Sequence, residues 1–309
     1  MIVFVFSYNR GPHLHNCIAS IERCAPGHRI VVFDDNSTDP ETLDVLKTIR
    51  ENHEVYSGAE KKGDQQHGGL YANMQRAFDM TSAQELVLFL QDDTQMVRPL
   101  SESDLDTLWD YFDRFPKAGF LSPAFRCGIT RKRVLNRFIY QPERNVYFCE
   151  HHSHKAQAGI YYSDISVTRS DRLRSVGWTF KPDEYENERQ CRANFDKMGY
   201  MYAPFAMWLP NAPAYRFKDK SFLFQLGERI NQSGLYPYKI MDEAAVARLK
   251  SRPGPELAIA ENHLSIDGKA LKKPWIFDPL RRPRWLRRIA KIDRKVRQLL
   301  SKLGLAQKA

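Results

Sequence analysis

Three apolar runs near the start of the chain are each followed by polar side chains, and two of these polar groups contain adjacent acids. The groups are Ser7-Tyr8-Asn9-Arg10 after residues 1–6, Asp34-Asp35 after residues 30–33, and Gln91-Asp92-Asp93 after residues 86–90. Adjacent carboxylates repel each other, so each pair needs a cation, hydrogen-bond donors or open water nearby. A hard divalent cation such as Mg²⁺ or Mn²⁺ binds oxygen ligands, often one or two carboxylates together with substrate phosphates.

The pair at Asp92 and Asp93 therefore suits a metal ion. The pair at Asp34 and Asp35 suits hydrogen bonds from the base or ribose of a nucleotide, and Tyr8 offers a ring for stacking. The alternative is that these residues only form turns and helix caps, which is their commonest use after strands.

Two later clusters of titratable residues admit more than one interpretation. The acids between residues 183 and 188 either contribute a general base or stabilise a helix N-terminus through its dipole. Among the histidines, no second ligand cluster has a recognised spacing, so a polar loop is favoured over a metal site or an acceptor pocket. The histidines of this cluster are His151, His152 and His154. His263 is a separate candidate metal ligand with no supporting residue around it. For Arg216 and Lys218, surface charge is favoured over binding of a diphosphate.

Strand and helix patterns alternate over the first 125 residues. The expected strands are residues 2–6, 30–33, 55–56, 86–90 and 119–121, and helical spacing of apolar residues falls between them. This order predicts an α/β fold with a mostly parallel sheet and helices on both faces. Because ligands bind beyond the carboxyl ends of such strands, the three polar groups are expected to meet at one edge.

The second half has weaker patterns. The stretch at 126–157 is polar and basic, and the next expected strand is at 160–168. The acidic run should open a helix that continues to Met198, followed by a strand at 200–209.

The basic charge is concentrated at the C-terminus. The net charge is +10, yet residues 281–309 hold 11 Lys and Arg and one acid, so the rest of the chain is neutral. An apolar stripe runs through this basic segment, which favours an amphipathic helix on an anionic membrane over packing on the body or a short coiled coil. Nucleic-acid binding is not expected, since no aromatic platform or known motif accompanies the charge. The stripe consists of Trp285, Ile289, Ile292, Val296, Leu299 and Leu303.

Several classes of protein are excluded by what the sequence lacks. No apolar run approaches the ~20 residues of a membrane-spanning helix, and Met1 leads directly into a strand without a basic leader. Five cysteines form no CxxC pair, which fits a reducing compartment. P-loop, dinucleotide, nucleophile-elbow and zincin motifs are absent. We therefore expect a cytoplasmic protein, bound peripherally at the inner face of the cytoplasmic membrane.

Four segments in the first 100 residues carry a resemblance to a known family. They are residues 6–10, 32–39, 69–73 and 88–93, with Pro99 beyond. The sequence resembles the inverting glycosyltransferases of family 2, which have the GT-A fold, and the likeness is weaker over 160–210. The resemblance implies a GT-A domain at 1–225, with a nucleotide-binding half at 1–98 and an acceptor half at 99–225. A C-terminal extension at 226–280 and the basic helix at 281–309 would follow.

The same resemblance implies roles for individual residues. Ser7 and Tyr8 would hold the nucleotide, and Asp35 would accept a hydrogen bond from the base, which suits uracil. Asp93 would bind Mn²⁺ or Mg²⁺, and Asp92 would face the ribose or sugar. The remaining implied donor-site residues are Asn9, Asp34 and Asn73. Gln91 replaces the first acid of the common Asp-x-Asp pattern.

The family also has a catalytic acid ahead of a helix that ends in Gly-Tyr. Counting back from Gly199-Tyr200 gives Glu188 as the general base, with Glu186, Glu184 and Asp183 as alternatives. The expected function is transfer of a sugar from a UDP-sugar to a glycan or lipid-linked acceptor in surface polysaccharide or lipopolysaccharide assembly. Two alternatives are a nucleotidyltransferase and a catalytically degenerate GT-A domain that acts as a membrane-associated scaffold.

Overall fold

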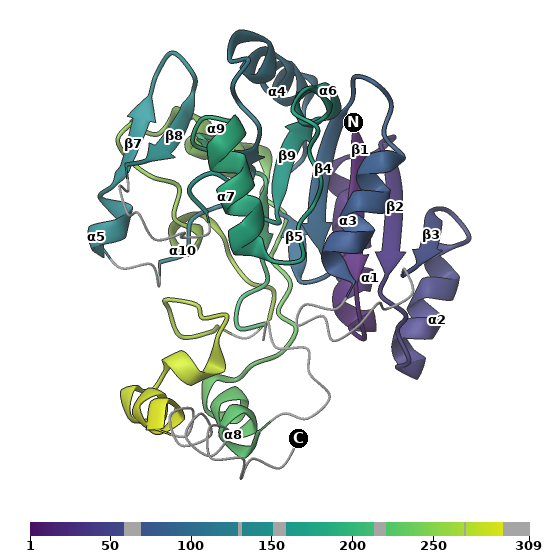
Figure 1. Ribbon diagram of the computed structural model, residues 1–309. Helices are drawn as coiled ribbons and strands as arrows, with labels where there is room; N and C mark the ends of the chain where they lie inside the picture. The colour runs from purple at the N-terminus through teal and green to yellow at the C-terminus, as the bar shows by residue number, and fades with distance from the viewer. Residues whose placement is uncertain (59–68, 129–131, 151–158, 213–220, 269, 293–309) are drawn as a thin grey trace, which may run out of the picture.

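The computed structural model describes residues 1–58, 69–128, 132–150, 159–212, 221–268 and 270–292. Its centre is a nine-stranded sheet with the order β3-β2-β1-β4-β9-β6-β10-β8-β7 (Figure 1). Among these described strands, all but β8 and β9 run in one direction. The strands are β1 (Ile2–Ser7), β2 (Arg29–Asp34), β3 (Glu54–Ser57), β4 (Leu86–Gln91), β6 (Leu121–Ser122), β7 (Phe138–Gln141), β8 (Val146–Cys149), β9 (Ser166–Arg169) and β10 (Gly199–Met201).

The parallel half of the sheet confirms the expected strands. β1, β2 and β4 are almost wholly buried, which explains why their sequences are continuous apolar runs and not alternating ones. Their carboxyl ends are in register, because Ser7 pairs with Asp34 and Phe6 pairs with Gln91. The three polar groups that follow these strands therefore leave the sheet at one edge.

Helices cover both faces of the sheet and close two apolar cores. The first core lies under α1, α2 and α4, and the second lies under α3, α6 and α7; α3 and α7 are on the near face in Figure 1. The helices are α1 (Gly11–Cys24), α2 (Pro40–Ile49), α3 (Leu70–Asp79), α4 (Glu102–Arg114), α5 (Lys132–Leu135), α6 (Ser170–Ser175) and α7 (Glu184–Asn194).

The helix expected to continue to Met198 ends at Asn194, because Phe195 has an extended backbone conformation. The second half departs from the expected elements at three further places. The β7–β8 hairpin lies in the polar and basic stretch at 126–157, where no element was expected. The strand expected at 160–168 is limited to β9, because the backbone N–H groups of Tyr161 and Tyr162 donate to the Glu188 carboxylate and not to a strand. The strand expected at 200–209 is two strands, β10 and β11 (Ala206–Trp208), and β11 pairs with β5 (Thr94–Met96) in a separate sheet.

The C-terminal part packs on the body through a third apolar core. Tyr238, Leu249 and Trp275 from this part are buried together with Val97 and Met207. Its elements are α8 (Phe222–Asn231), α9 (Glu243–Ser251), α10 (Ala260–His263), the 3₁₀ helix η1 (Pro279–Arg281) and a last helix at 284–292. Within the described ranges, no helix has the length and apolar character that crossing a bilayer requires.

Candidate active site

Ser7 and Asp35 lie side by side at the carboxyl edge of β1 and β2. The backbone N–H of Asp35 donates to the Ser7 carbonyl at 2.8 Å. The Asp35 Oδ2 accepts from the backbone N–H of Gly69 at 2.8 Å, which joins this edge to the start of α3. Both side chains are buried, yet no described residue hydrogen-bonds to Ser7 Oγ or Asp35 Oδ1. Since buried polar atoms are normally paired, these two atoms indicate a site for a polar ligand.

Asn9 and Asp34, two other residues of the predicted donor site, hold the surrounding loops. Asn9 has a φ of 50°, and its Oδ1 accepts from the backbone N–H groups of Thr38 and Asp39 at 2.8 and 3.0 Å. The Asp34 carboxylate accepts from the N–H and hydroxyl of Ser37. Burial raises the pKa of Asp34, although the bonds from Ser37 oppose this shift. Both side chains thus fix the backbone beside Ser7 and Asp35.

Asp92 and Asp93 share one guanidinium at the end of β4. Arg10 Nη1 lies 3.2 Å from Asp92 Oδ1 and 2.9 Å from Asp93 Oδ2. Asp92 is fully buried and also accepts from the backbone N–H of Tyr8 at 3.2 Å. Burial alone would lower the pKa of Arg10, but the two carboxylates raise it, so the guanidinium stays charged. Arg10 therefore supplies the positive charge that this acidic pair requires.

Asn73 lies on the first turn of α3, beside Asp35. It is buried, and its backbone N–H donates to the Gly69 carbonyl at 2.8 Å. Its Oδ1 accepts from Arg76 Nη1 at 3.3 Å. A Cβ at position 69 would overlap Asp35 Oδ1 and lie 3.5 Å from Asn73 Nδ2. The glycine therefore allows α3 to begin directly against Asp35.

The four acids proposed for the general base have different surroundings. Asp183 caps α7, since its Oδ1 accepts from the N–H groups of Tyr185 and Glu186. Glu186 is exposed. Glu188 has no exposed surface, and its oxygens accept from the N–H groups at 161 and 162 at 2.9–3.1 Å. Glu188 therefore lies one turn inside the helix, where its carboxylate holds the backbone of the 160–162 segment in place.

Glu184 belongs to a cluster of polar groups at the end of β4. Gln91 Nε2 lies 3.4 Å from Asp164 Oδ2, and the Tyr71 hydroxyl lies 3.3 Å from the same oxygen. Burial, followed by the nearby charge of Asp164, raises the pKa of Glu184 to about 8. Glu184 is only partly buried. A carboxylate with this pKa is suited to general-base chemistry near neutral pH.

The donor atoms at Asp92 and Asp93 are carboxylate oxygens, the type that Mg²⁺ and Mn²⁺ prefer. Their chemistry fits a divalent cation, although Asp93 Oδ2 is engaged by Arg10. The described residues contain no cluster of three or more His, Cys, Asp or Glu side chains able to hold a metal. His263 packs against Phe125, with ring centroids 6.1 Å apart. His151, His152, His154, Arg216 and Lys218 lie outside the described residues.

Two residues of this site had no role in the sequence analysis. Arg10 is the last residue of the Ser7-Tyr8-Asn9-Arg10 group. It directly precedes α1, and this position could have indicated its contact with the acids after β4. Asp164 lies in an irregular segment before β9 and belongs to no motif. Its contact with Gln91 depends on the antiparallel pairing of β4 with β9, which the local sequence does not encode.

Comparison with known proteins identifies the family. The model of glycosyl transferase family 2 matches residues 2–169, more than half of the chain. No curated protein sequence matches the chain significantly.

Similar solved structures include Staphylococcus aureus TarS 1–349, at 14% identity and a TM-score of 0.45, covering 81% of this chain and 69% of that one. The complex of the same protein with UDP has 16% identity and a TM-score of 0.45, covering 81% of this chain and 69% of that one. A complex of the galactosyltransferase LgtC with donor and acceptor sugar analogues has 14% identity and a TM-score of 0.37, covering 65% of this chain and 73% of that one. Because the family model spans the strands and loops that build the site, the chain belongs to glycosyl transferase family 2.

Proposed function

We propose that the protein transfers a sugar from a UDP-sugar to a hydroxyl group of a glycan or lipid-linked acceptor, with inversion at the anomeric carbon, in the assembly of surface polysaccharide or lipopolysaccharide. The observation that carries the proposal is the pair of buried oxygens of Ser7 and Asp35 at the carboxyl edge of the sheet, to which no residue of the described ranges hydrogen-bonds. Family membership supports the class of reaction.

The donor nucleotide would bind at this edge. Asp35 Oδ1 is an acceptor that the imide N–H of uracil can satisfy, and Ser7 Oγ would bond a neighbouring polar group of the nucleotide. Tyr8 would stack on the base, since its backbone is fixed by Asp92. Asp92, buried and oriented by two donors, would face the ribose or sugar.

A divalent cation would be held by Asp93 together with the donor diphosphate. When bound, Mn²⁺ or Mg²⁺ supplies Lewis-acid stabilisation of the charge on the leaving diphosphate. Arg10 would yield Asp93 Oδ2 to the ion and keep its contact with Asp92, 3.2 Å away.

We assign the general base to Glu184 and not to Glu188. Glu188 is buried under two backbone N–H donors, whereas Glu184 is partly exposed and its pKa of about 8 matches the task. As the acceptor oxygen forms a bond to the anomeric carbon, its proton passes to the Glu184 carboxylate. The bond between that carbon and the β-phosphate oxygen breaks, and UDP leaves with the electron pair. Attack opposite the leaving group inverts the centre.

The test is a screen of UDP-sugars with and without Mn²⁺ that measures released UDP in the presence of candidate acceptors. Glu184→Gln should lower turnover by about 10²–10⁴-fold and keep UDP affinity, and the matched Glu186→Gln, two residues along the same helix, should leave both unchanged. Pyrophosphate released from a nucleoside triphosphate would instead identify a nucleotidyltransferase. Absence of calorimetric UDP binding would favour the scaffold alternative.

We further propose that the C-terminal segment 281–309 binds an anionic membrane surface, where a lipid-linked acceptor would lie. The helix at 284–292 is fixed to α8, since a Cβ at Gly227 would lie 3.2 Å from the buried Leu286 (Figure 1). Trp285, Ile289 and Ile292 of the predicted stripe stay 48%, 42% and 62% exposed. Basic residues flank this stripe, so anionic lipid is the surface that complements it. Val296, Leu299 and Leu303 lie outside the described residues.

A further inference from the structure

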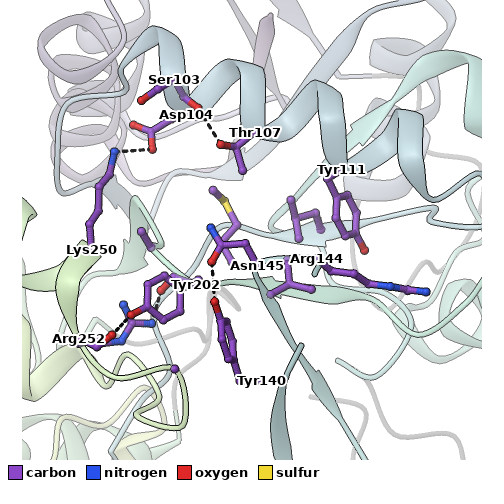
Figure 2. A pocket seen from close by; sticks show the side chains of 15 residues that line it. Ser103, Asp104, Thr107, Tyr111, Tyr140, Arg144, Asn145, Tyr202, Lys250 and Arg252 are labelled. Atoms are coloured by element: carbon purple, nitrogen blue, oxygen red, sulfur yellow. Dashed lines mark hydrogen bonds and ion pairs between the residues drawn. The ribbon is translucent and has the colours of Figure 1, made fainter. Parts of the chain in front are cut away.

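A cavity lies away from the donor site, between α4, the β7–β8 hairpin and the segment that follows α9 (Figure 2). Its volume is about 480 Å³, within the range of small-molecule sites. None of its lining residues belongs to the donor site. β5 leads the chain away from Asp93 to Arg98, whose guanidinium contacts Asp104 in the wall of the cavity at 2.7 Å. The cavity is therefore separate from the donor site.

The cavity wall has an excess of positive charge. Its charged lining residues are Arg144, Lys250, Arg252 and one acid, Asp104. Arg98 balances that acid, because its guanidinium binds both of the Asp104 oxygens. Burial would raise the pKa of Asp104, but Arg98 holds it well below its usual range. Lys250 Nζ also lies 3.0 Å from Asp104 Oδ1, but no other described acid lines the cavity, so Arg144, Lys250 and Arg252 leave its wall with a net positive charge.

The two arginines are held in place by groups that carry no charge. Arg252 is buried, and its guanidinium donates to the carbonyls of Glu256 and Leu249 and to the hydroxyl of Tyr147. The Arg144 guanidinium lies over the Phe115 ring, 4.1 Å from its centroid. No described carboxylate pairs with either arginine. Both cations are thus positioned in advance, and their charge remains available to an anion.

The other walls suit a sugar ring. Tyr140 and Tyr202 line the cavity with their ring centroids 5.1 Å apart, and Figure 2 shows Asn145 beside them. Asn145 Oδ1 accepts from the Tyr140 hydroxyl at 3.0 Å, and its backbone oxygen accepts from the Tyr202 N–H at 3.3 Å. These bonds fix the amide, and the hydroxyl groups of Ser103 and Thr107 line the opposite wall. Aromatic faces with a few fixed polar groups are typical of sites for small polar ligands.

We propose that this cavity binds a saccharide unit that carries a phosphate or carboxylate group. Arg144 and Lys250 would hold the acidic group, the half-buried Tyr140 would pack on the sugar ring, and Asn145 would bond its hydroxyl groups. The inference rests on the proposed function only in that such a unit would belong to the acceptor chain. Binding at this cavity and UDP binding at the donor site are separate measurements, so each can fail alone.

The test is calorimetric titration of the full chain with glucose 6-phosphate, glucuronate, glucose and inorganic phosphate. The two acidic sugars should bind more tightly than glucose or phosphate. The double variant Arg144→Met with Lys250→Met should bind them at least about tenfold more weakly, since each lost charge-assisted bond is worth 1.4 kcal/mol or more. UDP affinity should stay unchanged, which also reports that the variant is folded.

Arg114→Met is the matched control. Arg114 also lies over the Phe115 ring, 5.8 Å from its centroid, but it does not line the cavity. Its loss should leave the affinity for the acidic sugars unchanged. Three results would overturn the proposal: equal binding of glucose and glucose 6-phosphate, equal affinity of the double variant and the wild type, or competition of UDP with the acidic sugars. Inorganic phosphate binding as tightly as glucose 6-phosphate would reject the saccharide as the ligand.

Discussion

Arg10 joins two buried carboxylates, so removing its guanidinium should cost the fold a large part of its stability. The Arg10 side chain is 10% exposed, and those of Asp92 and Asp93 are 0% and 7% exposed. Arg10→Met would leave both acids without the cation that they share. Removal of one partner from a buried ion pair costs about 3–5 kcal/mol, because the remaining charge is desolvated and uncompensated. We expect a loss of that size in the free energy of unfolding.

The control is an arginine whose pair is exposed. Arg29 contacts Glu54 through two hydrogen bonds of 2.7 and 3.1 Å, but the two side chains are 47% and 41% exposed. Pairs of this kind contribute about 0–1 kcal/mol. Urea unfolding at pH 7 without divalent cations should therefore separate Arg10→Met from Arg29→Met by at least 2 kcal/mol, by the difference of these two ranges.

Mn²⁺ should then partly restore the Arg10→Met variant, since the ion can take the place of the lost charge. A cation at 100 times its dissociation constant stabilises a folded protein by about 2.7 kcal/mol. Wild type and Arg29→Met should gain less, because Arg10 competes for Asp93. If Arg10→Met unfolds within about 1 kcal/mol of Arg29→Met, the acids do not depend on Arg10. If Mn²⁺ stabilises both variants equally, Asp93 is not where the ion binds.

Three further predictions concern the base, the nucleotide site and the tail. The kcat/KM of the wild type should rise with pH through about 8, because Glu184 acts only when deprotonated and its pKa is about 8; Glu184→Gln should lose this rise. Gly69→Ala should weaken UDP binding about tenfold or more, measured by calorimetry, since its Cβ would displace Asp35 Oδ1. Trp285→Glu should reduce cosedimentation with anionic vesicles at low salt.

Each of these predictions has a matched control. Glu186→Gln should keep the pH profile of the wild type, and a flat profile in the wild type itself would contradict the assignment of the base. Gly234→Ala, whose Cβ would come no closer than 3.4 Å to its neighbours, should keep UDP affinity. Ile139→Glu is the control for Trp285→Glu, since it alters an apolar side chain that is 47% exposed on β7. If both variants lose vesicle binding equally, the tail has no specific role.

The donor edge was predictable from the sequence because the strands that build it are buried on both faces. Residues 2–6, 30–33 and 86–90 are continuous apolar runs, and the parallel order of their strands brings the residues that follow to one edge. The sequence therefore gave correct strands and a correct sheet edge. It did not reveal that Asn9 and Asp34 bond the neighbouring loops, since acceptors of this kind serve turns and ligands equally well.

The later half was less predictable because its contacts are long-range. β8 pairs with β10, about 50 residues further along the chain, and nothing near Val146–Cys149 encodes that partner. The general base was chosen in the sequence by a count along the chain, which gave Glu188 when started from Gly199. In the structure Asp183 caps the helix, and Glu188 lies one turn inside it, under Tyr161 and Tyr162. Caps depend on local side-chain bonds, which a count along the chain does not detect.

Gln91 illustrates how the charges of the site are balanced. The common family pattern has an acid at this position, but here the amide donates to Asp164, a carboxylate that β9 brings to the end of β4. An acid at position 91 would face Asp164 directly and raise the repulsion that already affects Glu184. Against these acids, Arg10 is the cation that the described residues place on Asp92 and Asp93. A donor diphosphate would add further negative charge, so among the described residues we expect either a cation to enter with it or Arg10 to turn toward it.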